Sequence, residues 1–198
     1  MKNFSFLSKL ITGLLFIFSS VACNPKDVNE SAEEEAEASL ITWDECGYSI
    51  SEHMCDFSFQ DQEDDTFNLY DNVGSPMVLD FSTMWCGYCQ VAAEDMSEIN
   101  DSWGHKNLIY ITILIEDIYG GEVDTSDLQV WADTFQIPRT SPILAGDRTI
   151  IDPSGEEGVS VTGWPTFLLL TDDLVIHGVM RGYSKEGLNS IIEDMLDS

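Results

Sequence analysis

The chain carries two cysteines spaced two residues apart, Cys86 and Cys89, in the stretch FSTMWCGYCQ that directly follows an apolar run. A pair with this spacing is compatible with a redox couple, half of a metal site or a structural crosslink. Each use needs different surroundings. The elements on either side of the pair therefore constrain the fold more than any other feature of the sequence.

The flanking residues predict a strand followed by a helix. Residues 76–83, PMVLDFST, form a short and mostly apolar run, which is typical of a strand buried on both faces. Residues 89–103, CQVAAEDMSEINDSW, lack Gly and Pro and carry apolar residues at helical spacing. A helix is therefore predicted to start at the second cysteine, with the first cysteine at its N-terminus.

The remaining domain is predicted to alternate strands and helices. Residues 55–75 indicate an extended edge or short hairpin with an acidic turn, and residues 107–117 a second buried strand. Residues 124–137 predict a helix with a Thr or Ser cap. Residues 166–183 predict two strands joined by an Asp-Asp turn, before a closing helix in 184–196. This order implies an α/β fold with a central mixed β-sheet flanked by helices on both faces.

Two segments resemble the signatures of the thioredoxin-like family. In PMVLDFSTMWCGYC, residues 76–89, a predicted strand ends in a Trp-Cys-x-x-Cys run that opens a helix. In GWPTFLLL, residues 163–170, the first four residues match the Gly-x-Pro-Thr segment that carries the family's cis-proline. Each motif lies in the predicted structural context. The resemblance covers roughly residues 55–197 and implies a thioredoxin-like fold and thiol–disulfide oxidoreductase activity.

The two cysteines are expected to have different roles. Cys86 lies where helix N–H groups favour a thiolate, the form that attacks a disulfide, and Cys89 one turn later is in reach to resolve the mixed disulfide. Asp80 occupies the position, six residues before the first cysteine, at which thioredoxins carry a buried acid. In an apolar strand its pKa should rise, which suits a proton relay for Cys89. Residues 107–183 contain no lysine, so a lysine partner for this acid is not expected.

The resemblance also implies a client-binding surface around the cysteines. A cis peptide bond at Pro165 would turn a backbone edge toward an extended substrate. Gly87 and Tyr88 replace the Gly-Pro of thioredoxin, and the residues at these places help set the reduction potential in the family. The expected contact residues are Trp85, Gly87, Tyr88, Trp164, Pro165 and Thr166.

A second cysteine pair, Cys46 and Cys55, lies in CGYSISEHMC. Together with His53 it matches no standard zinc spacing. In an exported chain, a structural disulfide that pins the start of the domain is the simpler interpretation. A relay of electrons from this pair to the other cysteines is the alternative, and neither a metal nor a cofactor is expected.

The first 39 residues are predicted to be processing and tether segments. Residues 1–22 combine a Lys-bearing start with an apolar run too short to span a bilayer, which indicates a signal peptide. The following Cys23 resembles the lipidated cysteine of bacterial lipoproteins, although Ser20 stands where that motif most often has Leu, so ordinary cleavage stays open. Residues 23–39 are acidic and lack aromatic residues, as expected of a tether. The folded domain is then residues 40–198, at the periplasmic or cell-surface side of a bacterial membrane.

The charge narrows the choice of partners. Asp and Glu total 36 against 8 Lys and Arg, which gives a formal net charge of -28. Such a surface repels nucleic acid and anionic lipid, so membrane contact is expected only through a lipid anchor. The excess charge serves either solubility or attraction to a cationic partner.

Three functions follow from these observations. The first is an extracytoplasmic thiol–disulfide oxidoreductase that acts on client proteins with thiols or disulfides and is recharged by an upstream redox partner. The second is a thiol peroxidase, because Thr83-x-x-Cys86 is similar to the peroxiredoxin motif, although that motif has Pro where this chain has Leu79 and leaves Cys89 unexplained. The third is a tethered binding or copper-handling module in which the pair is a permanent crosslink or a metal ligand.

Overall fold

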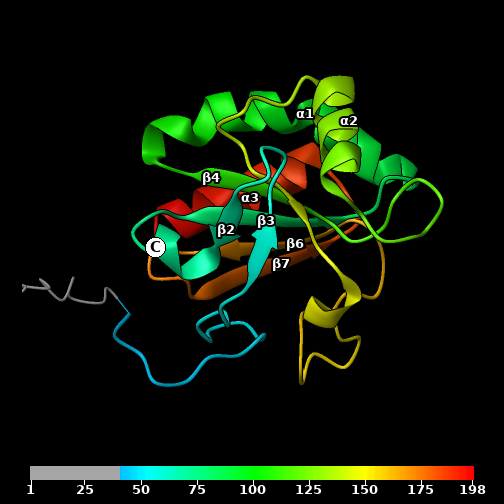
Figure 1. The fold of residues 1–198 in the computed structure, drawn as a ribbon. Coiled ribbons are helices and arrows are strands. Elements are labelled where there is room, and N and C mark those ends of the chain that lie inside the picture. Colours follow the sequence, from blue (N-terminus) through cyan, green and yellow to red (C-terminus); the bar gives the residue numbers. More distant parts are fainter. Residues whose placement is uncertain (1–40) are drawn as a thin grey trace, which may run out of the picture. The chain divides into compact units, whose positions relative to one another are not determined.

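A five-stranded mixed sheet lies at the centre of the structure, a computed structural model that describes residues 41–198 (Figure 1). The strand order is β5-β4-β3-β6-β7; β4 pairs in parallel with β3 and β5, whereas β6 runs antiparallel to β3 and β7. The strands are β3 (Met77–Ser82), β4 (Ile109–Leu114), β5 (Ile143–Ala145), β6 (Thr166–Leu170) and β7 (Ile176–Arg181). The predicted signal peptide, Cys23 and the tether lie outside the described residues.

The three α-helices of the described region begin at side-chain caps. They are α1 (Gly87–Trp103), α2 (Thr125–Phe135) and α3 (Lys185–Leu196). Cys86 caps α1, so this helix starts two residues before the predicted position. The cap of α2 is Asp124 rather than the expected Thr or Ser, because its carboxylate accepts the N–H groups of Ser126 and Asp127. Ser184 caps α3 as predicted.

The helices on the two faces of the sheet differ in kind. The connections β3–α1–β4 and β4–α2–β5 both join parallel strands and step in the same direction, so their right-handedness puts α1 and α2 on one face. α3 packs there as well, since Leu188 shares a buried cluster with Cys89 and Trp131. The opposite face is covered by the N-terminal segment and by two 3₁₀-helices, η1 (Leu69–Asn72) and η3 (Arg148–Ile150). The mixed sheet and α/β fold are thus confirmed, with true α-helices on one face only.

Strand β5 is the one sheet element that the sequence pattern did not predict. It has three residues and lies between Pro142 and Gly146, which is too short for a periodic signal. Its place is fixed by the predicted hairpin of β1 (Ser58–Gln60) and β2 (Thr66–Asn68). Gln62 in the turn of this hairpin is buried, and its Oε1 accepts the N–H of Ile143 at 2.8 Å.

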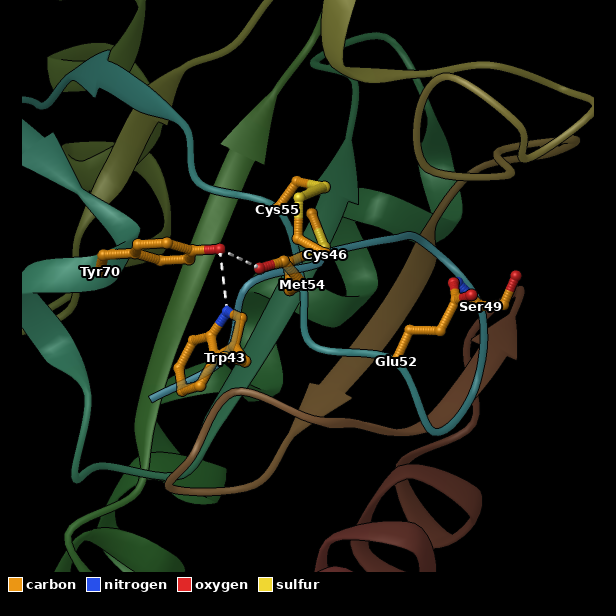
Figure 2. Close-up of a disulfide and its surroundings, with 7 residues drawn as sticks. All are labelled: Trp43, Cys46, Ser49, Glu52, Met54, Cys55 and Tyr70. Atoms are coloured by element: carbon orange, nitrogen blue, oxygen red, sulfur yellow. Dashed lines mark hydrogen bonds between the residues drawn. A yellow bond between two sulfur atoms is a disulfide. The ribbon is translucent and has the colours of Figure 1, made fainter. Parts of the chain in front are cut away.

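The segment before the hairpin carries a disulfide between Cys46 and Cys55, with an S–S distance of 2.09 Å (Figure 2). Figure 2 shows Tyr70 between two partners: its hydroxyl donates to the carbonyl of Met54 at 3.0 Å and receives the indole N–H of Trp43 at 3.3 Å. The N–H of Met54 in turn donates to the carbonyl of Leu174, before β7. The expected disulfide is thus present, and it closes a segment that is hydrogen-bonded to β7 through Ile176.

No helix within residues 41–198 has the length and apolar character needed to cross a membrane.

Candidate active site

The cysteine pair lies at the junction of β3 and α1, which a short turn holds in place. The N–H of Met84 donates to the carbonyl of Glu116 at 3.0 Å, and so ties the turn to the end of β4. Gln90, in the first turn of α1, donates from its Nε2 to the carbonyl of Met84 at 2.9 Å. These bonds anchor the turn on both sides of Cys86.

Cys86 and Cys89 are free thiols with different surroundings. Cys86 is 8% exposed and its Sγ accepts the backbone N–H of Cys89 at 3.3 Å. Cys86 is the N-cap of α1, a helix of 17 residues. Cys89 is fully buried, and burial followed by its hydrogen bond with Cys86 raises the pKa of its thiol. The two sulfurs therefore differ in their surroundings: Cys86 lies at the helix N-terminus, whereas the buried Cys89 is held in its protonated form.

Asp80 is a buried carboxyl group on β3, on the face of the strand that carries Val78 and packs against α1. Burial raises its pKa to about 7, although two hydrogen bonds lower it. These come from the hydroxyl of Ser82 at 2.6 Å and from the hydroxyl of Tyr110 at 3.1 Å. The charge of Asp80 contributes to the raised pKa of Cys89, so the two groups interact across the core. A group that titrates near neutrality beside a thiol can exchange a proton with it.

Tyr110 was not found by sequence reasoning. The absence of lysine left the partner of Asp80 open, and the parallel register supplies it: Val78 lies opposite Tyr110, and Asp80 opposite Thr112, so all four share a face. Burial, followed by the charge of Asp80, holds the pKa of the Tyr110 hydroxyl well above its ordinary value. Tyr110 therefore remains a hydrogen-bond donor. The only advance signal was a tyrosine inside a strand whose other residues are aliphatic apart from Thr112.

Glu116, a second residue that sequence reasoning did not find, holds Trp85 in place. The indole Nε1 of Trp85 donates to Oε2 of Glu116 at 2.7 Å, and the other carboxylate oxygen pairs with Arg148. Glu116 is buried directly after β4, whereas Trp85 is 46% exposed. The tryptophan is thus held at its polar edge and presents part of its ring to solvent. An acid near the end of the predicted buried strand of residues 107–117 was the signal that would have pointed to Glu116.

The other expected contact residues fall into exposed and buried groups. Gly87 begins α1, and Tyr88 is 69% exposed beside the cysteines. The Trp164–Pro165 peptide bond is cis, and the pairing of Phe81 with Thr166 sets this segment next to the end of β3. Thr166 is buried and its hydroxyl donates to the carbonyl of Gly163 at 2.8 Å, so its side chain does not face solvent.

A cavity of about 580 Å³ adjoins the cis-proline segment and is lined in part by Gly163, Trp164, Val161 and Arg148. Within residues 41–198, no three His, Cys, Asp or Glu side chains lie close enough to hold a metal ion. His53, the histidine nearest the disulfide pair in sequence, stacks on Trp43 with ring centroids 4.1 Å apart. The chemistry that the described residues offer at this site is that of the two thiols and the buried acid.

Solved structures with a similar fold are thiol–disulfide proteins. A thiol:disulfide interchange protein of the thioredoxin family from Chlorobium tepidum is 18% identical, with a TM-score of 0.59, and the match covers 78% of this chain and 99% of that one. A secreted disulfide oxidoreductase of Mycobacterium tuberculosis, homologous to E. coli DsbE, is 16% identical, with a TM-score of 0.52 and coverage of 70% and 95%.

A third is the exposed lipoprotein thioredoxin of Streptococcus pneumoniae, at 22% identity and a TM-score of 0.52, with coverage of 70% and 99%. At these identities the matches show the fold alone, which is thioredoxin-like. No curated protein sequence matches the chain.

The family assignment comes from a match that starts within the disulfide-closed segment and extends just beyond η3. Residues 50–153 match the model of the AhpC/TSA family, which is more than half of the 198 residues. The matched range contains both cysteines of the pair, Asp80, Tyr110 and Glu116. The chain therefore belongs to the AhpC/TSA family.

Proposed function

We propose that this protein is an extracytoplasmic thiol–disulfide oxidoreductase that exchanges disulfides with client proteins through the couple Cys86-Gly87-Tyr88-Cys89. The observation that carries the proposal is the inequivalence of the two sulfurs. Cys86 caps a helix and accepts the N–H of Cys89, whereas Cys89 is buried with Asp80. A permanent crosslink has no need for this difference, but a nucleophile and its resolving partner do.

The proposed reaction proceeds in two exchanges. The Cys86 thiolate attacks one sulfur of a client disulfide; a Cys86–client bond forms, the client S–S bond breaks, and the departing client thiolate takes a proton. Cys89 then gives its proton to Asp80 and attacks Cys86, which releases the second client sulfur as a thiolate. The client gains two electrons and the couple becomes a disulfide. The same steps run in reverse oxidise a client dithiol, and a dithiol or disulfide partner resets the couple.

Client contacts are assigned to the surface around Cys86. Trp85 and Tyr88 expose aromatic surface next to the sulfur, and Gly87 leaves the approach open because no side chain intervenes. Trp164 and Pro165 supply the opposite side, together with the backbone of Thr166. The exposure of Trp85 and Tyr88 supports the first side of this assignment, and the strand register that brings the two segments together supports the second, where Pro165 is buried.

The proposed place of action is outside the cytoplasm, with Cys23 as the lipid anchor. The support is the sequence of residues 1–39 and the Cys46–Cys55 disulfide, since such bonds persist mainly in oxidising compartments. Two of the similar structures are described as a secreted and an exposed lipoprotein enzyme.

A thiol peroxidase is the second candidate, because the AhpC/TSA family also includes peroxidases. The hydroxyl of Thr83, three residues before Cys86, is buried and has no hydrogen-bond partner among residues 41–198. A hydroxyl without a partner is available to donate a hydrogen bond to an oxygen atom of a bound peroxide. The candidate leaves the buried Cys89 without a role.

One pair of measurements separates these functions. Equilibration of the Cys86–Cys89 couple against glutathione or dithiothreitol buffers should give a potential between roughly -270 and -120 mV, the range of thioredoxin to DsbA. A pair that stays oxidised far below that range would be a structural crosslink and would refute the proposal. Peroxide consumption that survives Cys89→Ser but not Cys86→Ser would establish the peroxidase instead.

A further inference from the structure

Exposed apolar side chains are concentrated at the cysteine end of the molecule. Among residues 41–198, seven large apolar side chains are strongly exposed, and six of them belong to the Trp-Cys-x-x-Cys segment, the start of α1, the loop after β4 or α2. The seventh, Ile50, lies inside the disulfide-closed segment. The six are Trp85, Tyr88, Val91, Ile118, Tyr119 and Val130. Scattered exposed apolar residues need no explanation, but such a concentration marks an interaction surface.

A groove runs through this surface between α1 and α2. It has a volume of about 380 Å³, and its walls are mostly apolar. We call it the α1–α2 groove, and its walls include Met84, Gln90, Ile118, Val130, Trp131 and Phe135. Met84 and Gln90 flank the cysteine pair in sequence, so one end of the groove adjoins the reactive sulfurs. The cavity beside Trp164 shares no lining residue with it.

The charge around the groove selects its occupant. Neither α1, nor α2, nor residues 115–124 of the connecting loop contain a Lys or Arg, whereas each contains Asp or Glu. Asp127 itself lines the groove. Three cations elsewhere in the described region form ion pairs: Arg139 with Glu63, Arg148 with Glu116, and Lys185 with Asp95. A segment that carries positive charge is therefore attracted to the α1–α2 groove.

The same charge disfavours two other occupants. A second copy of this chain would bring together two surfaces of a molecule with a formal net charge of -28. The chain's own residues 24–39 carry a surplus of Glu and Asp and would meet repulsion at the same place. Like charges that meet at an interface cost free energy, and the cost grows as salt is lowered.

From this geometry we infer that the α1–α2 groove is a docking site for client proteins and takes a large apolar side chain that neighbours a Lys or Arg near the client's reactive cysteine. The inference rests on the proposed function and names its client class. Docking at one end of the cysteine pair places the client sulfur next to Cys86. Selectivity would then come from a site distinct from the segment around the cis-proline.

Synthetic peptides test the inference on the unmodified protein. Each carries one cysteine as a mixed disulfide with glutathione, with Arg-Leu, Arg-Ser or Glu-Leu placed two to five residues away. The reduced protein should react with the best Arg-Leu peptide roughly tenfold faster than with its Arg-Ser counterpart. The Arg-Leu peptide should also react faster than the Glu-Leu peptide, and that advantage should shrink as NaCl is raised. Equal rates for the three sets at low salt would overturn the inference.

Matched substitutions locate the effect. Ile118→Ser and Val130→Ser should lower the ratio of the Arg-Leu peptide rate to the glutathione disulfide rate, whereas Ile50→Ser, an equally exposed change outside the groove, should leave it unchanged. An equal fall in all three variants, or no fall in either groove variant, would overturn the docking site.

Two further outcomes distinguish this inference from its alternatives. If the protein self-associates in sedimentation and Ile118→Ser abolishes the association, the groove is assigned to a second copy of the chain. A reduced protein that does not react with glutathione disulfide would refute the proposed function and the inference with it, whereas normal reaction without peptide selectivity refutes the inference alone.

Discussion

The indole N–H of Trp85 donates a hydrogen bond of 2.7 Å to the buried carboxylate of Glu116, which lies just after the end of β4. Because Glu116 also pairs with Arg148 of η3, the tryptophan before the first cysteine is connected to two other elements of the fold. The end of β4, η3 and the surface that flanks Cys86 are therefore joined through one buried carboxylate.

Glu116→Ala should lower the free energy of unfolding by about 1–3 kcal/mol, since it removes the acceptor of Trp85 and the partner of Arg148. Glu116→Gln should cost less, because the amide oxygen still accepts the indole N–H. Urea unfolding measures both changes. The exposed Glu122→Ala on the same loop serves as the control, expected within about 0.5 kcal/mol of the original protein. A similar loss in all three variants would mean that the hydrogen bond between Trp85 and Glu116 does not contribute measurably to stability.

Asp80→Asn should stabilise the protein at alkaline pH. The folded pKa of Asp80 is about 7, against 3.8 for an ordinary aspartate, so the folded state holds one more proton than the unfolded state between these values. The contribution of Asp80 to the free energy of unfolding is fully present below about pH 4 and is lost as the pH rises to about 7. At about 1.4 kcal/mol per pKa unit, the variant should gain up to about 4 kcal/mol at pH 8 and almost nothing at pH 4. Urea unfolding of the reduced protein at both pH values checks this, and a gain that does not change with pH would contradict the raised pKa.

Tyr110→Phe should destabilise the protein mainly when Asp80 is charged. The lost hydroxyl donates to the carboxylate at 3.1 Å, and hydrogen bonds to charged groups are worth about 1.5–3 kcal/mol. The loss should appear in full at pH 8 and be smaller at pH 5, and the pKa of Asp80 should rise further. Tyr183→Phe is the matched control, because its hydroxyl donates to the less buried Asp95 at 2.9 Å. An identical pH profile for the two variants would argue against a special Tyr110–Asp80 pair.

Cys89→Ser should trap a mixed disulfide between Cys86 and a client. Removal of the resolving thiol leaves the first exchange possible and blocks the second. Mass spectrometry after mixing with an oxidised client should find the adduct on Cys86 in this variant and none in Cys86→Ser. Equal adduct formation through Cys89 in the Cys86→Ser variant would show that the two sulfurs are not distinguished as their burial indicates.

Removal of both Cys46 and Cys55 by serine should lower stability without loss of exchange. The bond closes a loop with a sequence separation of 9, for which chain entropy gives about 2–3 kcal/mol. Thermal unfolding measures the loss, and the rate of exchange at 25 °C measures activity. A large fall in that rate while the fold persists would instead support a relay of electrons from this pair to Cys86 and Cys89.

Local sequence carried most of the architecture. The apolar run of residues 76–83 predicted β3, and the helical spacing after the cysteines predicted α1, because both patterns report the burial of consecutive residues. The cis-proline segment and the Cys46–Cys55 disulfide also lie where the motifs and cysteine spacing led us to expect. The signal peptide, lipid anchor and tether expected in residues 1–39 stay predictions, because they lie outside the described residues.

The partners of the site residues could not be obtained in that way. Tyr110 and Glu116 reach Asp80 and Trp85 from β4, across 30 and 31 residues of sequence, and only the parallel register of the strands decides which side chains share a face. The short β5 depends on the buried Gln62 of the distant hairpin, and the gathering of α1 and α2 on one face follows from the handedness of the crossovers. The sequence by itself determined the position of the cysteine pair and the strand and helix that hold it, since these depend on neighbours along the chain. The tertiary structure alone decided what surrounds the pair: the hydrogen bond from Tyr110 to Asp80, the bond between Trp85 and Glu116, and the α1–α2 groove. These contacts exist only once distant segments are packed together.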